Sequence, residues 1–457
     1  MESNHSKNYK RNFLLGIGNG TLVNFGMAFV DPFTVLPVFI SRMGGSSLVV
    51  GLVSALYGAG WFLPQVFVSR VVETRHRVLG IYQNMAVLRI LTWAAATMTI
   101  FLVSPDRPAM FLSLFIISLL LTNLGSGIAA IPFLEIISRT IPTTQRGRFF
   151  GLRRFIGGLL GIVAGILVGI ILKENADGND ALGWVSASAT AIAGRLGLAG
   201  HEFPSNYGIL FVLGGLFISL GIILFCFVAE TPTKTVQKPR RLLEHLTTGF
   251  SLIRHDANYR LFYLVRICWQ FSAMAFPFYS TFAIGDLGFS ESSVGIFVSL
   301  WVGSGVISNT IWGRILDRRG NKLVLILTAG LSIIPPITGL ALDYFHSGSR
   351  LAVSSWLVFG MISSTFFING LIRSGRFISN ITYLLEVAPA DKRPLYVGFM
   401  NSFTFPLMLS PALGGLILSL AGIKVLFSVS LCFAIGNLIL SSRLREPRGM
   451  IPDGFSE

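Results

Sequence analysis

One charged stretch separates two long apolar runs of the sequence: Gly313-Arg314-Ile315-Leu316-Asp317-Arg318-Arg319-Gly320-Asn321-Lys322. The runs on either side of it, 293–312 and 323–342, are each long enough to cross a hydrocarbon core of about 30 Å as one helix. The stretch itself holds four basic side chains and one acidic side chain, which are costly to place in lipid. The sequence therefore predicts two transmembrane helices that are joined by a short charged turn at one face of a membrane.

The same pattern of apolar runs extends over the whole chain. Further runs of similar length occur at 13–40, 48–69, 78–103, 109–137, 155–172, 208–229, 259–284, 351–385, 397–421 and 425–442. With 52% hydrophobic residues, 12% charged residues and a mean hydropathy of +0.69, the 457 residues cannot form an ordinary water-facing surface. Helices satisfy their backbone hydrogen bonds within one segment, which such runs require in lipid. We therefore predict an all-α polytopic membrane protein with 12 transmembrane helices.

The basic residues set the expected orientation. The formal net charge is +15, and most of the 36 Lys and Arg residues lie in alternate loops and near both ends of the chain. Loops on the cytoplasmic side of a membrane carry such an excess of Lys and Arg. We therefore expect both termini to be cytoplasmic in a multi-pass protein of the cell inner membrane. The positive charge then needs no nucleic acid as a partner.

An internal repeat divides the chain into two halves. A Pro-x3-Arg-x4-Gly spacing follows Glu135 as Pro142, Arg146 and Gly151, and it recurs after Glu386 as Pro389, Arg393 and Gly398. Parallel repeats of this kind are typical of transporters with two related halves. We predict two pseudo-symmetric six-helix bundles, 1–229 and 259–457, which are joined by residues 230–258.

The connecting segment 230–258 is basic and then amphipathic. Leu242, Leu246 and Phe250 recur at helical spacing after a group of Lys and Arg residues. Such a segment lies on anionic membrane lipid as a tether, or it acts as a regulatory helix. We expect it on the cytoplasmic side, with lipid as its partner.

The stretch 313–322 resembles the G-x-x-x-D-R-x-G-x-K/R signature of the major facilitator superfamily. The corresponding loop after the second run keeps Glu73, Arg75 and Arg77 but lacks both glycines. Glu386, Pro389 and Arg393 are similar to an E-x-x-P-x3-R element that sugar porters have after helix ten. The resemblance implies alternating access between two helical bundles. It also implies a cytoplasmic gate, for which the candidates are Gly313, Asp317, Arg318, Gly320, Glu386, Arg393, Glu135, Arg146 and Glu73.

The gate candidates have expected partners. By the pseudo-symmetry, Asp317 should face the start of the fifth helix beside Arg146 and Arg148. Glu73 should face the start of the eleventh helix near Arg393. An anion is stabilised at a helix N-terminus, and glycines permit a tight turn and close helix approach.

Arginines within the apolar runs are the main candidates for a solute site, because charges at bilayer depth are rare and mark function. Arg373 and Arg376 are one turn apart near mid-depth, and Arg89 lies about halfway along the third run. Guanidinium groups bind carboxylate or phosphate through paired hydrogen bonds. The alternative is structural, with an arginine pairing with Asp31 or capping the carbonyls of a broken helix. Further candidates for lining the site are Asn24, Trp269 and Gln270.

Asp31 is the candidate for proton coupling. It lies within the first run in Asp31-Pro32-Phe33-Thr34-Val35-Leu36-Pro37, a segment similar to a pattern in helix one of some drug–proton antiporters. Burial and a neighbouring arginine have opposite effects on the proton affinity of a carboxyl group. The fifth run also contains Gly157, Gly161, Gly165 and Gly169, a strip that predicts close helix packing.

The sequence offers no chemistry for an enzyme. It contains no phosphate-binding Gly-Lys-Ser/Thr loop and no His/Cys cluster, and Cys226, Cys268 and Cys432 lie apart in apolar runs. We expect no metal and no cofactor. We predict a monomeric secondary active transporter for a small organic solute, with an anionic solute and proton coupling as the sharper hypothesis. The alternatives are a multidrug/proton efflux antiporter, a lipid flippase, or a non-transporting receptor or scaffold of the same fold.

Overall fold

The structure is a computed structural model that describes residues 2–173, 191, 193–232, 254, 256–347, 354–388, 396, 400 and 404–447. These residues form helices and turns, and none of them is in a β-strand. In this part of the chain, nine helical segments are long and apolar enough to cross a membrane. The prediction of an all-α polytopic membrane protein is therefore confirmed. Arg393 and most of the predicted linker 230–258 lie outside the described residues.

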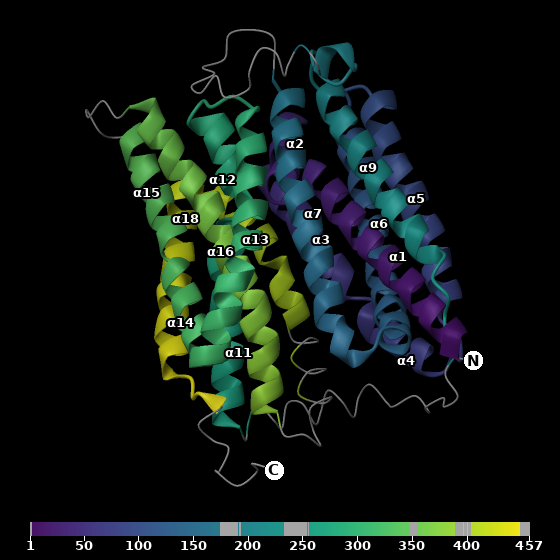
Figure 1. Ribbon diagram of the computed structural model, residues 1–457. Coiled ribbons are helices and arrows are strands. Elements are labelled where there is room, and N and C mark those ends of the chain that lie inside the picture. The colour runs from purple at the N-terminus through teal and green to yellow at the C-terminus, as the bar shows by residue number, and fades with distance from the viewer. Residues whose placement is uncertain are drawn as a thin grey trace.

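The helices of the first half lie together on one side of the molecule, on the right in Figure 1, coloured purple to teal. They are α1 (Glu2–Phe29), α2 (Val35–Arg42), α3 (Ser47–Phe62), α4 (Gln65–Glu73), α5 (Leu79–Leu102), α6 (Pro108–Thr140), α7 (Thr143–Ile171) and α9 (Ser205–Cys226). The boundaries of α5 and α6 agree closely with the predicted runs. Helix α7 begins twelve residues before the predicted 155–172 and includes a basic segment that hydropathy assigns to a loop.

The helices of the second half lie on the other side, coloured green to yellow in Figure 1. They are α11 (Ala257–Ser272), the 3-10 turn η1 (Ala273–Ala275), α12 (Phe278–Thr281), the π-helical turn η2 (Phe282–Asp286), α13 (Ser293–Arg319), α14 (Asn321–Leu331), α15 (Ile334–Ser347), α16 (Ser355–Val387), the 3-10 turn η3 (Phe405–Leu409) and α18 (Ser410–Arg443). Gly422 has a φ of +82° and divides α18 into two parts. The first part contacts α3 at Pro411, and the second contacts α12 through Phe427.

Several membrane helices are broken at prolines. The regular α-helical hydrogen bonding is interrupted between α1 and α2 at Pro32, between α3 and α4 at Pro64, and between η1 and α12 at Pro277. Helix α14 ends just before Pro335 and Pro336. Proline has no N–H and cannot complete the helical hydrogen bond to the residue four positions earlier. Such breaks are tolerated in lipid only where protein or water satisfies the freed backbone groups.

Glycines bring the two halves into direct backbone contact. A Cβ atom on Gly165 of α7 would lie 2.8 Å from the carbonyl oxygen of Gly295 on α13, and a Cβ on Gly295 would lie 2.4 Å from the backbone nitrogen of Gly169. A second contact joins Gly51 of α3 to the backbone of Pro411 at the start of α18. The predicted packing role of the glycine strip in the fifth run is therefore confirmed, and it operates between the halves.

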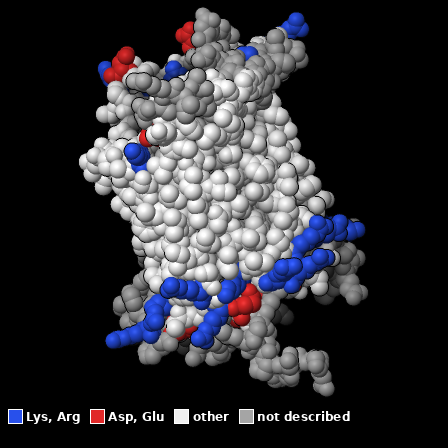
Figure 2. All heavy atoms as spheres, turned by 90° about the vertical axis from the view of Figure 1, so that its left-hand side faces the viewer, with Lys and Arg blue, Asp and Glu red and all other residues white. Residues whose placement is uncertain are grey.

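Charged side chains gather at the two ends of the molecule. Figure 2 shows the α14 side, where most Lys and Arg form a band near the lower end and the middle is almost free of charge. We call the lower end the basic end, because it contains the α4–α5 turn with Arg75 and Arg77 and the last turn of α13 with Arg318 and Arg319. Mid-helix positions expose large apolar side chains such as Leu91 of α5, which is typical of a surface covered by lipid.

Candidate functional site

The side chain of Arg373 lies between the two halves of the molecule. It leaves α16 near the middle of that helix, and its guanidinium carbon is 4.9 Å from the centre of the Trp301 ring on α13. Its charge acts on Asp31, on Tyr57 of α3 and on Arg154 of α7. Because these partners belong to the first half, the exposed guanidinium points into the molecule rather than toward lipid. A molecule lying between the halves would contact Arg373.

Arg373 lies over one member of a connected group of four aromatic side chains, which we call the aromatic cluster: Phe33, Tyr57, Phe276 and Trp301. The ring centres of Phe276 and Trp301 are 4.6 Å apart, and Phe33 lies 6.1 Å from Trp301 and 6.2 Å from Tyr57. The cluster therefore joins residues of both halves. The indole nitrogen of Trp301 is buried and has no hydrogen-bond partner in the structure.

Asp31 is buried at the break between α1 and α2. Its carboxylate oxygen Oδ1 accepts hydrogen bonds from the backbone N–H of Phe33 and from the hydroxyl group of Thr34, both at 2.9 Å. These bonds replace part of the hydrogen bonding that the break removes from the helix. Asp31 thus stabilises the chain at the break through these hydrogen bonds, and its carboxylate also interacts electrostatically with Arg373.

Arg376 occupies a different environment from Arg373. Its side chain is completely buried, and its guanidinium carbon lies 5.8 Å from the ring centre of Trp269 on α11. None of its three guanidinium nitrogens has a hydrogen-bond partner in the structure. A buried charge without a partner costs several kcal/mol. The structure therefore does not bring the two predicted arginines together, since each lies over a different tryptophan.

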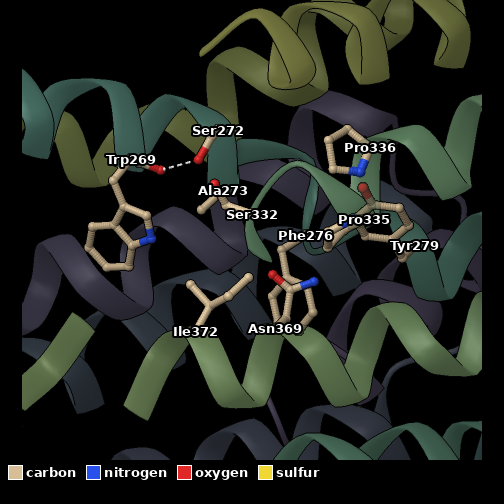
Figure 3. Close-up of a pocket in the computed structure, with 10 residues that line it drawn as sticks. All are labelled: Trp269, Ser272, Ala273, Phe276, Tyr279, Ser332, Pro335, Pro336, Asn369 and Ile372. Carbon is tan, nitrogen blue, oxygen red and sulfur yellow. Dashed lines mark hydrogen bonds between the residues drawn. The ribbon is translucent and has the colours of Figure 1, made fainter. Parts of the chain in front are cut away.

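Trp269 also borders a small cavity inside the second half, which Figure 3 shows between α11, α12, α15 and α16. The cavity has about 20 Å³ of space and is lined by Trp269, Ser272, Ala273, Phe276, Tyr279, Ser332, Pro335, Pro336, Asn369 and Ile372. The hydroxyl group of Tyr279 is buried there and has no hydrogen-bond partner among the described residues. A space of this size and polarity accommodates about one water molecule. It is too small for an organic solute.

The other predicted lining residues lie apart from one another. Arg89 of α5 packs on Gly125 of α6, and its buried Nε atom has no hydrogen-bond partner in the described part of the chain. Asn24 is exposed on α1 and packs against Gly157 of α7. Gln270 donates a hydrogen bond to the hydroxyl group of Ser410, at 3.3 Å, which ties α11 to α18.

Two arginines near the site are missed by the sequence reasoning. Arg153 of α7 donates a hydrogen bond to Asn19 of α1, at 3.0 Å, and its guanidinium carbon lies 4.6 Å from the Phe133 ring centre. The guanidinium carbon of Arg154 lies 3.8 Å from the ring centre of Phe377 on α16. Both lie just before the predicted run 155–172, so hydropathy does not include them in the membrane helix. Pro142 is a helix-start signal, and neither a proline nor two consecutive glycines follow it before Gly157. A helix that begins after Pro142 would therefore include both arginines.

At the basic end, Arg139 of α6 connects three parts of the first half. It forms ion pairs with Glu135, at 2.8 Å, and with Glu230, at 3.3 Å. Glu230 in turn accepts hydrogen bonds from the backbone N–H groups of Val78 and Leu79 at the start of α5. Carboxylates are favourable at helix N-termini, so this group fixes the end of α9 to the start of α5.

The second half contains a similar arrangement. Glu446, which follows α18, accepts a hydrogen bond from the backbone N–H of Lys322, at 2.9 Å, near the start of α14. Glu386 accepts a hydrogen bond from Asn321, at 2.6 Å. Gly320 has a φ of +83°, and a Cβ atom there would lie 2.5 Å from the carboxyl carbon of Glu446. The turn therefore requires glycine at position 320, as the motif implies.

The remaining gate candidates are placed as follows. Asp317 and Arg318 are exposed in the last turn of α13. Arg146 donates hydrogen bonds to the carbonyl oxygens of Ile141 and Ser138 at the end of α6. No described atom lies within 4 Å of a Cβ placed on Gly313, so close helix approach is not the reason for that glycine. The side chain of Glu73 lies outside the described part of the structure.

A contact group at the opposite end of the molecule, which the sequence did not reveal, joins the two halves. We call it the Glu291 latch: Arg42, Phe203, Tyr207 and Glu291. Glu291, just before α13, pairs with Arg42 at 2.5 Å and accepts a hydrogen bond from the Tyr207 hydroxyl group at 2.9 Å. The Arg42 guanidinium carbon lies 4.4 Å from the ring centre of Phe203. The latch closes this end, because Arg42 and Tyr207 belong to the first half and Glu291 to the second.

Replacing Glu291 with glutamine should open this end of the molecule. The change removes the charge that holds Arg42, and a partly buried ion pair of this kind is worth about 1–2 kcal/mol. The population with the end open should then rise about tenfold. Spin labels at Leu48 and Leu420, exposed on either side of the interface, should report a longer distance in a cysteine-free background. Glu202→Gln, an exposed acid at the same end, is the control, and an unchanged distance in Glu291→Gln would mean that the latch does not hold the halves together.

The family comparison agrees with this architecture. The family model described as "Major Facilitator Superfamily" matches residues 179–366 and 261–455, which together span more than half of the chain. No curated protein matches the chain by sequence.

Solved structures share the fold over nearly the whole chain. A D-xylose–proton symporter superposes with a TM-score of 0.66 at 14% sequence identity. The alignment covers 97% of this chain and 99% of the symporter chain. The nucleoside transporter NupG gives a TM-score of 0.63 at 13% sequence identity, and the alignment covers 96% of this chain and 98% of the NupG chain. The xylose transporter XylE from E. coli, in a partially occluded inward-open conformation, gives a TM-score of 0.63 at 13% sequence identity. The alignment covers 98% of this chain and 100% of the XylE chain. With the family match, this likeness means that the chain belongs to the major facilitator superfamily and is a multi-pass membrane transporter rather than an enzyme.

Proposed function

We propose that this protein is a secondary active transporter that moves a small anionic organic solute across the cell inner membrane by alternating access, coupled to protons. The observation on which this depends is the exposed guanidinium of Arg373 between the two halves, which lies over the ring of Trp301. Two of the similar solved structures are a D-xylose–proton symporter and a nucleoside transporter. For this chain, an arginine at that position favours a solute with a carboxylate or phosphate group.

The proposed topology has twelve membrane crossings in two bundles, 1–229 and 259–457, with a cytoplasmic linker at 230–258. Among the residues that the structure describes, nine segments qualify as crossings by length and apolarity. The other three are the broken segment α1–α2, the short segment α3–α4, and the second part of α18 after Gly422. The basic end is proposed to be cytoplasmic, together with both termini, because Lys and Arg accumulate on that side of a membrane.

The closed end of the molecule then faces outward. The Glu291 latch and the contact between Gly165 and Gly295 hold the halves together at that end. We propose that Arg373 is reached from the cytoplasm in this arrangement. The switch to the outward-facing state would separate the latch and bring the gate candidates at the basic end together.

The solute site is proposed to combine positive charge with aromatic walls. The carboxylate of a solute would bind to the guanidinium N–H groups of Arg373 through paired hydrogen bonds. Phe33 and Tyr57, which are half-buried, would contact its apolar part. Arg89 and Arg154 add positive potential, which raises the local concentration of anions.

Transport by the purified protein in proteoliposomes tests this proposal. A labelled small carboxylate should accumulate under an inward proton gradient, and a protonophore should abolish the accumulation. Solute binding without uptake would indicate a receptor instead. Proton-driven extrusion of cationic dyes would indicate a drug antiporter, and translocation of labelled lipid would indicate a flippase.

Proton coupling is proposed to arise from competition for Arg373. When Asp31 is ionised, its charge attracts the guanidinium and competes with an anionic solute. When Asp31 is protonated, Arg373 is available to the solute. Solute and proton would then cross together, since each favours the binding of the other.

Asp31→Asn should therefore uncouple solute from protons. An asparagine side-chain oxygen can still accept the hydrogen bonds from Phe33 and Thr34, so the helix break is preserved. Solute exchange across the membrane should persist, while solute-driven proton uptake, measured with a pH-sensitive dye inside the liposomes, should vanish. Asp106→Asn, at an exposed acid between α5 and α6, should behave as the wild type. Stoichiometric proton uptake by Asp31→Asn would show that another group carries the proton.

A further inference from the structure

A groove lies at the basic end between the last turns of α13 and the first turns of α14. It has a volume of about 410 Å³ and is lined by Arg314, Ile315, Arg318, Arg319, Leu323 and Leu327. Its lining is half arginine and half aliphatic. The solute site between the halves does not include any of these residues.

The helical register places the arginines on one wall. Arg314 and Arg318 are four residues apart on α13 and share a face, and Arg319 ends the helix. The turn at Gly320, with its φ of +83°, then reverses the chain into α14. Leu323 and Leu327, also four residues apart, form the opposite, apolar wall.

The guanidinium groups of the groove are available for a ligand. Arg314, Arg318 and Arg319 are all exposed, and none of them makes a hydrogen bond or ion pair with another described residue. Each guanidinium offers five donors in a planar fork that matches phosphate oxygens. The groove therefore favours an anion with several oxygen atoms.

The aliphatic wall distinguishes a lipid from a free anion. Leu327 is exposed and Leu323 is half-buried, and α14 continues from them into the uncharged surface. Figure 2, which faces the α14 side, shows that this surface begins directly above the band of Lys and Arg. A phospholipid at a membrane surface has its phosphate at the level of the basic band and its acyl chains at the level of the uncharged surface.

We propose that this groove binds one anionic phospholipid, with its phosphate at Arg314, Arg318 and Arg319 and an acyl chain along Leu323 and Leu327. A free phosphate would use only the arginines and would gain nothing from the leucines. The bound lipid would connect the α13–α14 turn to the anionic leaflet. This site is separate from the proposed solute site and does not depend on the identity of the solute.

Native mass spectrometry of the intact protein tests the proposal, with phosphatidylglycerol and phosphatidylcholine as probes. Both lipids contain a phosphate, but only phosphatidylglycerol has a net negative charge. The wild type should retain one phosphatidylglycerol in preference to phosphatidylcholine. The triple variant Arg314→Gln, Arg318→Gln, Arg319→Gln should retain at least about tenfold less, since each arginine near an anionic surface contributes about fivefold.

A triple variant with the same change in net charge is the control: Arg75→Gln, Arg77→Gln, Arg443→Gln, all exposed. It should retain phosphatidylglycerol as the wild type does. Equal loss in both triple variants would overturn the proposal, because it would indicate attraction by the whole basic end. Leu327→Asn should also weaken lipid retention several-fold. If Leu327→Asn has no effect and inorganic phosphate displaces the lipid, the groove is a free-anion site and the proposal is wrong.

Discussion

Uptake of an anionic solute is expected to fall about 100-fold when Arg373 is replaced with glutamine. The guanidinium of Arg373 lies exposed between the halves, over the ring of Trp301. Losing a charge-assisted, paired hydrogen bond to a carboxylate costs about 2–5 kcal/mol, and a factor of 100 corresponds to about 2.8 kcal/mol. Initial uptake rates in proteoliposomes at several solute concentrations would measure the loss.

Two further arginine variants serve as a conservative substitution and as a control. Arg373→Lys keeps the charge but loses the planar fork and the stacking on Trp301, so its uptake should be intermediate. Arg195→Gln changes an exposed arginine that lies outside the region between the halves and should transport normally. If Arg373→Gln transports every tested anion at the wild-type rate, a cationic solute site at this position is ruled out.

The positions of the helices follow from hydropathy to a large extent. The run 78–103 corresponds to α5 at Leu79–Leu102, because membrane insertion depends on summed apolarity over such a segment. Hydropathy fails where a helix continues into a basic segment. Helix α7 begins at Thr143, and the arginines of its first three turns lower the apolarity without interrupting the helix.

The chemistry of the site was predictable, but its contacts were not. An arginine at mid-depth is conspicuous in any apolar run, so Arg373 and Arg376 could be chosen from the sequence alone. Residues three positions apart on a helix differ by about 60° in direction, and this difference places the two guanidiniums over different tryptophans. The partner Trp301 belongs to another helix, and no local pattern encodes such a contact.

The Glu291 latch was missed for the same reason. Arg42 and Glu291 are 249 positions apart, and each looks like an ordinary loop charge in the sequence. The glycine strip on α7 was easier to recognise, since its period is local. What the sequence did not provide was the identity of the opposing helix, which the structure shows to be α13.

Gly165→Val is expected to prevent closure of the end that contains the Glu291 latch. A Cβ atom at Gly165 would lie 2.8 Å from the backbone nitrogen of Ser299 and from the carbonyl oxygen of Gly295. Backbone atoms cannot rotate away as a side chain can, so α7 and α13 must separate. Overpacking of this kind costs about 1–3 kcal/mol, which shifts the ratio of closed to open molecules about 5- to 150-fold.

The labelled pair at Leu48 and Leu420 should report this shift as a longer distance, and solute transport should slow by about tenfold or more. Transport requires both states, so a protein held open at one end can bind solute but completes few cycles. Gly147→Val is the matched control, because Gly147 lies on the same helix and no described atom is within 4 Å of a Cβ placed there. If Gly165→Val lowers thermal stability but leaves the label distance unchanged, the glycine contact only stabilises the fold. If the distance lengthens while Gly147→Val does not alter it, the α7–α13 contact determines which end of the transporter is closed.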